Sequence, residues 1–191
     1  MAVASVMEAG DEDLVRQIAK GERRALETLY ARHHRRVFHF IRRFEDNTAM
    51  AEDLANDVFL DVWSLAGRFE FRSRVTSWLL GIARYKALNA RRARKKTVDP
   101  EEALGGLADG ADTPEITAQK VSKAEALRNC IAALPEEHRI VIDLVYYHET
   151  SVRDVAEILQ VPENTVKTRM FNARRKLSAL MQAAGLDRGW P

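Results

Sequence analysis

The placement of proline divides this chain into two blocks that can each be helical. Proline is absent from residues 1–99, and residues 11–96 are rich in helix-forming residues. Residues 97–117 (TVDPEEALGGLADGADTPEIT) then carry two prolines and three glycines, a composition typical of a linker. Helical periodicity returns over residues 118–182, and no alternating β-branched run predicts a sheet.

We therefore expect an all-α protein with two small helical domains, at residues 11–96 and 118–182. A flexible acidic linker at residues 97–117 joins them. Residues 1–10 are expected to be a disordered N-terminus, and residues 183–191 a tail.

Charge is segregated along the chain, although the formal net charge is only +2. Residues 84–96 hold seven basic residues and no acid, whereas residues 97–119 hold six acids and no basic residue. Such segregation predicts separate surfaces with separate partners. No signal peptide or membrane-spanning run is evident, so we expect a cytoplasmic protein without membrane insertion. The single cysteine, Cys130, lies in an apolar helical stretch and is interpreted as a buried, inert thiol rather than a redox sensor.

Residues 151–177 (SVRDVAEILQVPENTVKTRMFNARRKL) have the pattern of a helix-turn-helix. Ser151 can cap a first helix that packs through Val152, Val155, Ala156 and Leu159. Pro162 suits the start of a second helix, whose inner face carries Val166, Met170, Ala173 and Leu177. A longer helix from Pro135 would brace this pair through Ile140, Val141, Leu144 and Val145.

The outer face of that second helix is polar and cationic. It carries Asn164, Thr168, Phe171, Asn172 and Arg175, with Lys167 and Arg174 on one flank and Arg169 and Lys176 on the other. Polar groups toward base edges and cations toward phosphates suit a helix in the DNA major groove. Apolar contact with a thymine methyl would explain Phe171. The alternative is an ordinary pair of helices with a solvated basic face.

Residues 51–69 (AEDLANDVFLDVWSLAGRF) predict a helix that ends near Gly67 and carries a row of acids. Its core stripe is Ala51, Leu54, Ala55, Val58, Val62 and Leu65. Asp53, Asp57 and Asp61 stack at i, i+4 and i+8, a spacing that destabilises an isolated helix by about 0.2–0.5 kcal/mol per pair. No lysine or arginine lies between Asn47 and Gly67 to relieve them. The row is either a solvated face or the binding site of an external basic partner.

Residues 68–96 (RFEFRSRVTSWLLGIARYKALNARRARKK) combine aromatic and basic side chains. Phe69 and Phe71 lie in or beside a short loop that continues through Arg72, Ser73 and Arg74. A helix follows, with Val75, Trp78, Leu79, Ile82 and Ala83 at its start and a basic far end. Aromatic rings beside a cationic track are typical of single-stranded nucleic acid binding, although a core position alone would explain Trp78.

Four motifs together resemble the extracytoplasmic-function (ECF) sigma factors of bacterial RNA polymerase, within the sigma-70 superfamily. They are DLVRQIAKGERRALETLYARHHRRVFHFI, AEDLANDVFLDVW, SWLLGIARYKALNARRARKK and LPEEHRIVIDLVYYHETSVRDVAEILQVPENTVKTRMFNARRKL. They follow the family's order and spacing and cover nearly the whole chain outside the linker and the ends. The resemblance implies a sigma2-like helical bundle, a sigma4-like helix-turn-helix domain, and a linker that threads toward the polymerase active-site channel. It further implies promoter-specific initiation with core polymerase, without catalysis or a cofactor.

The resemblance also assigns a role to each surface. The first domain docks on the polymerase β′ clamp through Asp53, Asn56, Asp57, Leu60 and Asp61. It recognises the −10 element, duplex and melted non-template strand, through Phe71, Arg72, Ser73, Arg74, Arg84, Arg91 and Arg92. The second domain meets the β flap and reads the −35 element through Glu163, Asn164, Lys167, Thr168, Arg169, Phe171, Asn172 and Arg175.

Because of two departures from the family, the resemblance does not assign a base preference at the −10 or the −35 element. Asn172 stands where many relatives carry arginine or histidine, and the loop FEFRSRV differs from the commoner glycine-containing versions. Many relatives are sequestered by an anti-sigma factor, often membrane-anchored, so the resemblance implies such a partner here. Released from it, the protein would associate with the nucleoid.

Two other classes of protein explain less of the chain. A helix-turn-helix regulator that acts without polymerase would leave the acidic helix and the aromatic loop without a role. A DNA-cutting enzyme would need a nucleophile or clustered carboxylates for metal ions, and the acidic row has no histidine or cysteine beside it. His33, His34 and His39 have no acid or cysteine near them in the sequence and are interpreted as helix surface, not as metal ligands.

Overall fold

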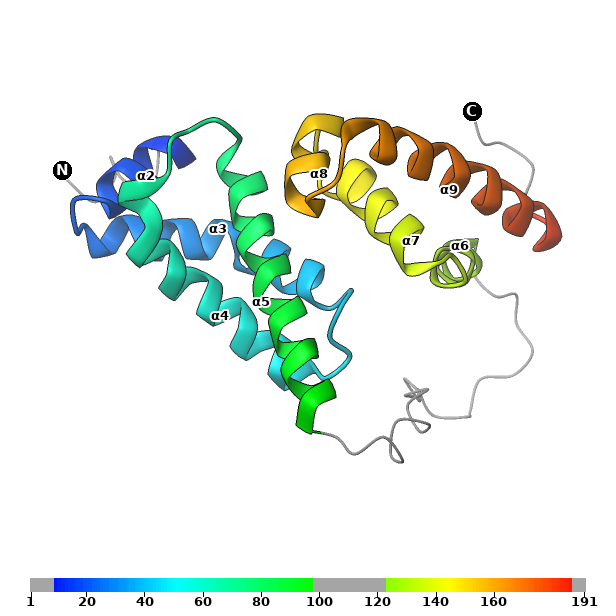
Figure 1. The fold of residues 1–191 in the computed structure, drawn as a ribbon, viewed down its shortest axis with the longest axis horizontal. Helices are drawn as coiled ribbons and strands as arrows, with labels where there is room; N and C mark the ends of the chain where they lie inside the picture. Colours follow the sequence, from blue (N-terminus) through cyan, green and yellow to red (C-terminus); the bar gives the residue numbers. More distant parts are fainter. Residues whose placement is uncertain (1–8, 98–122, 187–191) are drawn as a thin grey trace. The chain divides into compact units, whose positions relative to one another are not determined.

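The computed structural model describes residues 9–97 and 123–186, which form two helical units (Figure 1). The first unit contains α2 (Asp11–Ile18), α3 (Arg23–Ile41), α4 (Thr48–Leu65), the 3-10 turn η1 (Ala66–Arg68) and α5 (Val75–Thr97). The second contains α6 (Lys123–Ala132), α7 (Glu136–Ile142), the π-helical turn η2 (Asp143–Tyr147), most of α8 (Val152–Leu159) and α9 (Glu163–Ala183). The prediction of an all-α fold with two helical domains is confirmed.

The predicted linker lies outside the described residues, except for Thr97 at the end of α5. The same holds for residues 1–8 of the expected N-terminus and residues 187–191 of the expected tail. The domain limits drawn from the sequence therefore stay predictions.

The first unit is a bundle in which α3, α4 and α5 pack against one another and α2 packs on α3. Its largest fully buried side chains are Leu14, Ile18, Leu29, Phe40, Ile41, Leu79 and Leu80. The stripe predicted for α4 is confirmed at Ala51, Ala55, Val58 and Val62. Leu54 and Leu65 are only partly buried, and Phe59 lies in the core instead. Phe59 reaches the core because it follows Ala55 by four residues and precedes Val62 by three.

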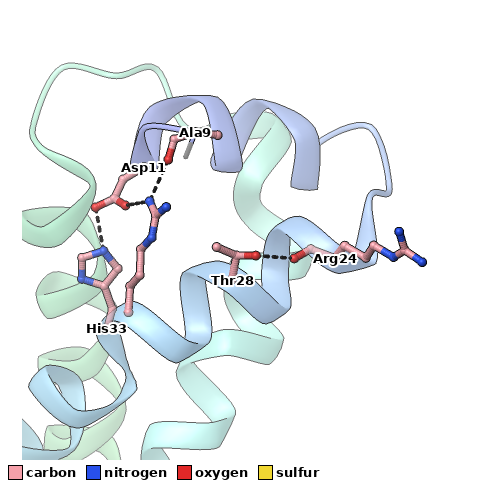
Figure 2. Close-up of polar contacts among 6 residues, drawn as sticks. Ala9, Asp11, Arg24, Thr28 and His33 are labelled. Atoms are coloured by element: carbon pink, nitrogen blue, oxygen red, sulfur yellow. Dashed lines mark hydrogen bonds and ion pairs between the residues drawn. The ribbon is translucent and has the colours of Figure 1, made fainter. Parts of the chain in front are cut away.

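The interpretation of the α3 histidines as helix surface was wrong for His33 and His34. His33 is only 7% exposed, and its Nε2 lies 2.6 Å from Asp11 Oδ2 (Figure 2). His34 is largely buried as well, with its Nε2 3.1 Å from Glu52 Oε1. The two acids come from α2 and α4, so neighbouring sequence positions gave no sign of either pair.

Asp11 fastens α2 to α3 through both of its carboxylate oxygens. Oδ2 pairs with His33, and Oδ1 accepts a hydrogen bond of 3.0 Å from Arg32 Nη1. The same Nη1 donates to the backbone oxygen of Ala9 at 2.7 Å. Leu14, Val15 and Ile18 bury the inner face of α2 beside these contacts.

Replacing Asp11 with asparagine is expected to lower the free energy of unfolding of the first unit by about 1–2 kcal/mol, because a charge-assisted hydrogen bond to a buried ring is lost. Urea unfolding followed by tryptophan fluorescence in a Trp190→Phe background measures this, since Trp63 and Trp78 of the first unit then supply the signal. Glu27→Gln removes an exposed α3 pair with Arg23 and should change stability by less than about 0.5 kcal/mol. Equal effects of the two variants would contradict the fastening role.

The predicted stripes of the helix-turn-helix are confirmed at most positions. Val155, Ala156 and Leu159 of α8 are buried, as are Val166, Met170 and Ala173 of α9, whereas Val152 and Leu177 are partly buried. Cys130 of α6 is also buried, as expected. Leu134, Ile142 and Ala173 form one cluster, against which Leu177 and Leu180 pack.

The single long helix predicted from Pro135 is interrupted. Pro135 does cap α7, but the α-helix ends at Ile142 and a π-helical turn follows over Asp143–Tyr147. In this wider turn the His148 N–H donates to the Asp143 backbone oxygen at 3.1 Å. Both side chains are buried, with His148 Nε2 3.2 Å from Asp143 Oδ2. A period of 3.6 residues does not predict one widened turn, yet the apolar positions Ile140, Val141 and Leu144 are buried as expected.

Candidate functional site

One side of α4 carries the acidic residues together with exposed apolar ones. Asn47 caps the helix, since its Oδ1 accepts the Met50 N–H at 3.0 Å. We call Asp53, Asn56, Asp57, Leu60 and Asp61 the acidic face; the first four are exposed and Asp61 is half-buried. Leu60 is 64% exposed, and Trp63, which was not predicted, is 41% exposed. Large apolar side chains left in solvent beside acids indicate a surface for a macromolecular partner.

The acidic face is partly neutralised within the unit, which corrects the inference drawn from its sequence. Lys86 of α5 places its Nζ 3.0 Å from Asp61 Oδ2 and 4.0 Å from Asp57 Oδ2. No cation lies on α4 beside the row, and this one comes from α5. Asp53 makes no ion pair among the described residues. The case for an external partner therefore rests on Leu60, Trp63 and Asp53 rather than on repulsion along the row.

Tyr30 of α3, which sequence reasoning missed, orients Asn56. The Tyr30 hydroxyl donates to Asn56 Oδ1 at 2.8 Å. Its ring stacks on His34 at a centroid distance of 4.5 Å and meets Phe59 edge-on at 4.8 Å. Because the amide oxygen is engaged, Asn56 offers its amide N–H groups to a partner.

Residues 69–74, which we call the aromatic loop, connect η1 to α5. Phe69 stacks on Trp78 at 4.4 Å, and Phe71 lies against Phe69 at 4.8 Å. The guanidinium of Arg16, from α2, covers Phe71 at 4.4 Å from the ring centroid. The two rings are thus packed against neighbours and are not free platforms for bases. This arrangement agrees with a packing role for Trp78.

The loop's polar residues face outward more than its rings. Arg72 and Arg74 are exposed and Ser73 is half-buried. Arg72 Nε lies 2.8 Å from Glu70 Oε2 of the same loop. On α5, Arg84 and Arg91 are half-buried, whereas Arg92 is exposed.

Two cations of the basic α5 segment serve the fold. Lys86 binds the acidic face, and Arg94 Nη2 lies 2.5 Å from Glu45 Oε2. Glu45 is only 3% exposed and also accepts the Asn47 N–H at 2.9 Å. Tyr85, between Arg84 and Lys86, is 66% exposed and was not among the predicted site residues.

The helix-turn-helix forms with the local contacts that its sequence predicts. Ser151 Oγ accepts the Asp154 N–H at 3.1 Å at the start of α8. Gln160 adopts a left-handed backbone conformation (φ 55°) in the turn. Pro162 occupies the N-cap of α9, and its carbonyl accepts the N–H groups of Thr165 and Val166.

All residues predicted to read the −35 element lie on α9. Glu163, Asn164, Lys167, Thr168, Phe171 and Arg175 are exposed, whereas Arg169 and Asn172 are half-buried. Phe171 is 66% exposed, as expected for a side chain outside the core stripe. The exposed row matches the geometry of a helix that enters a groove.

Four cations of α9 divide into two groups. Arg169 Nη2 lies 3.0 Å from Glu137 Oε2 of α7, and Arg174 Nε donates to the Tyr146 hydroxyl at 2.7 Å. Lys167 and Arg175 are exposed and make no ion pair within the described part of the chain. Lys167 and Arg175 are therefore available to phosphates. Arg169 and Arg174 instead join α9 to α7 and η2.

Among residues 9–97 and 123–186, no three histidine, cysteine or acidic side chains gather so as to hold a metal ion. None of the helices in these ranges is both long and apolar enough to cross a membrane.

Comparisons with known proteins match both units. The family model for Sigma-70 region 2 matches residues 29–97, and the one for Sigma-70 region 4 matches residues 124–177. The ECF RNA polymerase sigma factor SigM of Mycobacterium tuberculosis is 33% identical over 175 residues, which cover 91% of this chain and 86% of SigM. The RNA polymerase sigma-H factor of Pseudomonas aeruginosa is 28% identical over 181 residues, 90% of this chain and 94% of that protein.

Two solved structures share the fold. The sigma factor RpoE in complex with the anti-sigma factor NepR from Bartonella quintana has a TM-score of 0.64 and 21% identity, covering 82% of this chain and 96% of RpoE. CnrH in complex with the cytosolic domain of CnrY has a TM-score of 0.63 and 24% identity, covering 91% of this chain and 97% of CnrH.

Proposed function

Because the chain belongs to the ECF sigma factors of the sigma-70 family, we propose that it binds core RNA polymerase and directs initiation at specific promoters. It does so by recognising a −10 and a −35 element. The observation that carries this function is the presence of both units in one chain, the first with an exposed acidic and apolar face on α4. A polymerase-independent regulator would need only the helix-turn-helix, so that alternative is not favoured.

Each surface then has a proposed partner. The acidic face binds the β′ clamp. The exposed Leu60 and Trp63 support this role, because large apolar side chains exposed beside charged ones mark protein interaction sites. The aromatic loop and the basic side chains of α5 engage the −10 element. The outer face of α9 reads the −35 element while its unit meets the β flap.

The same reasoning extends to regulation and location. RpoE and CnrH were each solved with a partner, an anti-sigma factor and the cytosolic domain of CnrY. We infer that an anti-sigma factor also sequesters this chain in the cytoplasm and that the released protein acts on the nucleoid. Catalysis belongs to the polymerase, and the chain supplies recognition.

Run-off transcription with core polymerase and a genomic promoter library tests the proposal. We expect transcripts only when the chain is added, with start sites that share one pair of −10 and −35 sequences. Duplexes carrying these sites should bind the isolated chain weakly. Tight binding to duplex DNA by the isolated chain, without any initiation, would instead support the polymerase-independent regulator.

A further inference from the structure

Four side chains from three elements form one continuous column in the first unit. Trp78 of α5 stacks on Phe69 at an interplanar angle of 17°, and Phe69 contacts Phe71 within the aromatic loop. The guanidinium of Arg16 of α2 then closes the column, 4.4 Å from the centroid of Phe71. The loop is thus held between α5 on one side and α2 on the other.

Phe71 needs such support because of its backbone. Its φ is 56°, in the left-handed region that a bulky side chain rarely adopts. A residue in this region keeps its conformation only when surrounding contacts fix it. The Phe71 ring contacts the aromatic ring of Phe69 and the guanidinium of Arg16. Removing either should let the loop relax.

Two ion pairs within α2 orient Arg16. Its guanidinium binds Asp13 Oδ1 at 2.9 Å and Glu12 Oε2 at 3.1 Å, both on α2. The helix in turn is fastened to α3 through Asp11, as Figure 2 shows for its contact with His33. Arg16 therefore links the loop to α2, a helix that is packed on α3. α2 lies outside residues 29–97, the part matched by the region 2 family model.

We propose that Arg16 is a positioning residue for the aromatic loop and thereby helps to set base preference at the −10 element. This inference rests on the proposed function, because it assigns the loop to promoter recognition. Arg16 acts through Phe71: its guanidinium lies over the ring, and a lysine ammonium, a compact and strongly hydrated charge, would cover the ring less well. Arg72, Ser73 and Arg74 follow Phe71 directly, so their placement depends on the conformation of that residue.

The first test measures the loop without polymerase or DNA. In a Trp63→Phe/Trp190→Phe background, Trp78 alone reports on the column through its fluorescence and its quenching by acrylamide. Arg16→Ala should increase quenching of Trp78, and Arg16→Lys should do the same. Arg23→Ala is the matched control, since Arg23 is highly exposed and, among the described residues, pairs only with Glu27 in α3. Unchanged quenching in Arg16→Ala would overturn the positioning role. This test contains no polymerase or promoter, so its result does not depend on the proposed function.

The second test measures promoter choice with core polymerase and a promoter randomised at the −10 element. Arg16→Ala should lower initiation from preferred sequences by about three- to tenfold and broaden the preference, with unchanged affinity for core. In a Phe71→Ala background it should have no further effect. Rescue by Arg16→Lys, or effects that add to those of Phe71→Ala, would mean that Arg16 contacts phosphate directly and would overturn the inference. Absence of initiation by the unmodified chain would overturn the proposed function instead.

Discussion

Replacing Asp53 with lysine and Leu60 with alanine is expected to weaken binding to core RNA polymerase by about 100- to 1,000-fold, because each change removes about 2 kcal/mol of contact at the centre of the interface. Both side chains are exposed on the same side of α4, and neither contributes to the buried core of the first unit. The variant should therefore fold normally. Titration of a labelled chain with core polymerase, together with thermal unfolding, measures the two effects.

The choice of residues follows from the contacts of the acidic face. Lysine at position 57 would meet the ammonium of Lys86, so a loss of binding there could come from the fold. Asp53 has no such neighbour among the described residues. Glu27→Lys, a charge reversal at an exposed position of α3, is the matched control and should leave core affinity unchanged. Full affinity in the Asp53→Lys/Leu60→Ala variant would contradict the assignment of α4 to the polymerase.

Patterns within one helix were predictable because they depend only on the period of that helix. The spacing of Val155, Ala156 and Leu159 identified the inner face of α8, and Ser151 was identified as its cap. The acidic face was likewise visible as a row on α4. Such features need no knowledge of which helices become neighbours.

Contacts between helices could not be predicted in the same way. Lys86 reaches Asp61 only because α5 packs along α4, and His33 reaches Asp11 only because α2 packs on α3. Each pairing changed an interpretation. The Lys86–Asp61 pair reduces the like-charge repulsion expected along α4. The His33–Asp11 pair shows that His33, predicted to lie on the helix surface, is buried. The contact between Arg16 and Phe71 belongs to the same class, which is why sequence reasoning had no role for Arg16.

The same distinction decides which cations of α9 should matter most for DNA. From the sequence, Lys167, Arg169 and Arg175 were assigned to the −35 element together. The structure separates Lys167 and Arg175, which make no ion pair in the described ranges, from Arg169 and Arg174, which bind Glu137 and Tyr146. Arg175 lies 6.0 Å from the ring centroid of Phe171 on the same helix, so it can turn to a phosphate without breaking a contact between helices. Arg169 and Arg174 must first lose their partners on α7 and η2.

Replacing Lys167 and Arg175 with alanine should therefore lower the affinity of the polymerase complex for a promoter with a −35 element by about 10- to 100-fold, and reduce the slope of log affinity against log salt by about two. Affinity for core should not change, because both residues lie on the outer face of α9, which is proposed to face DNA, and neither belongs to the acidic face of α4. Binding measured between 50 and 200 mM salt, about the range over which phosphate contacts are most visible, provides the test. Promoters without a −35 element should show little difference between the variant and the unmodified chain.

Arg169→Ala and Arg174→Ala form the matched pair, because they remove the same amount of charge from the same helix. We expect them to reduce the salt slope less and to lower the thermal stability of the second unit, since each breaks a contact between α9 and the segment from α7 to η2. If instead they reduce the salt slope as much as Lys167→Ala/Arg175→Ala, the contacts to Glu137 and Tyr146 give way when DNA binds. Availability in the free protein would then not identify the phosphate-binding cations, and the whole basic side of α9 would have to be treated as one DNA-binding surface.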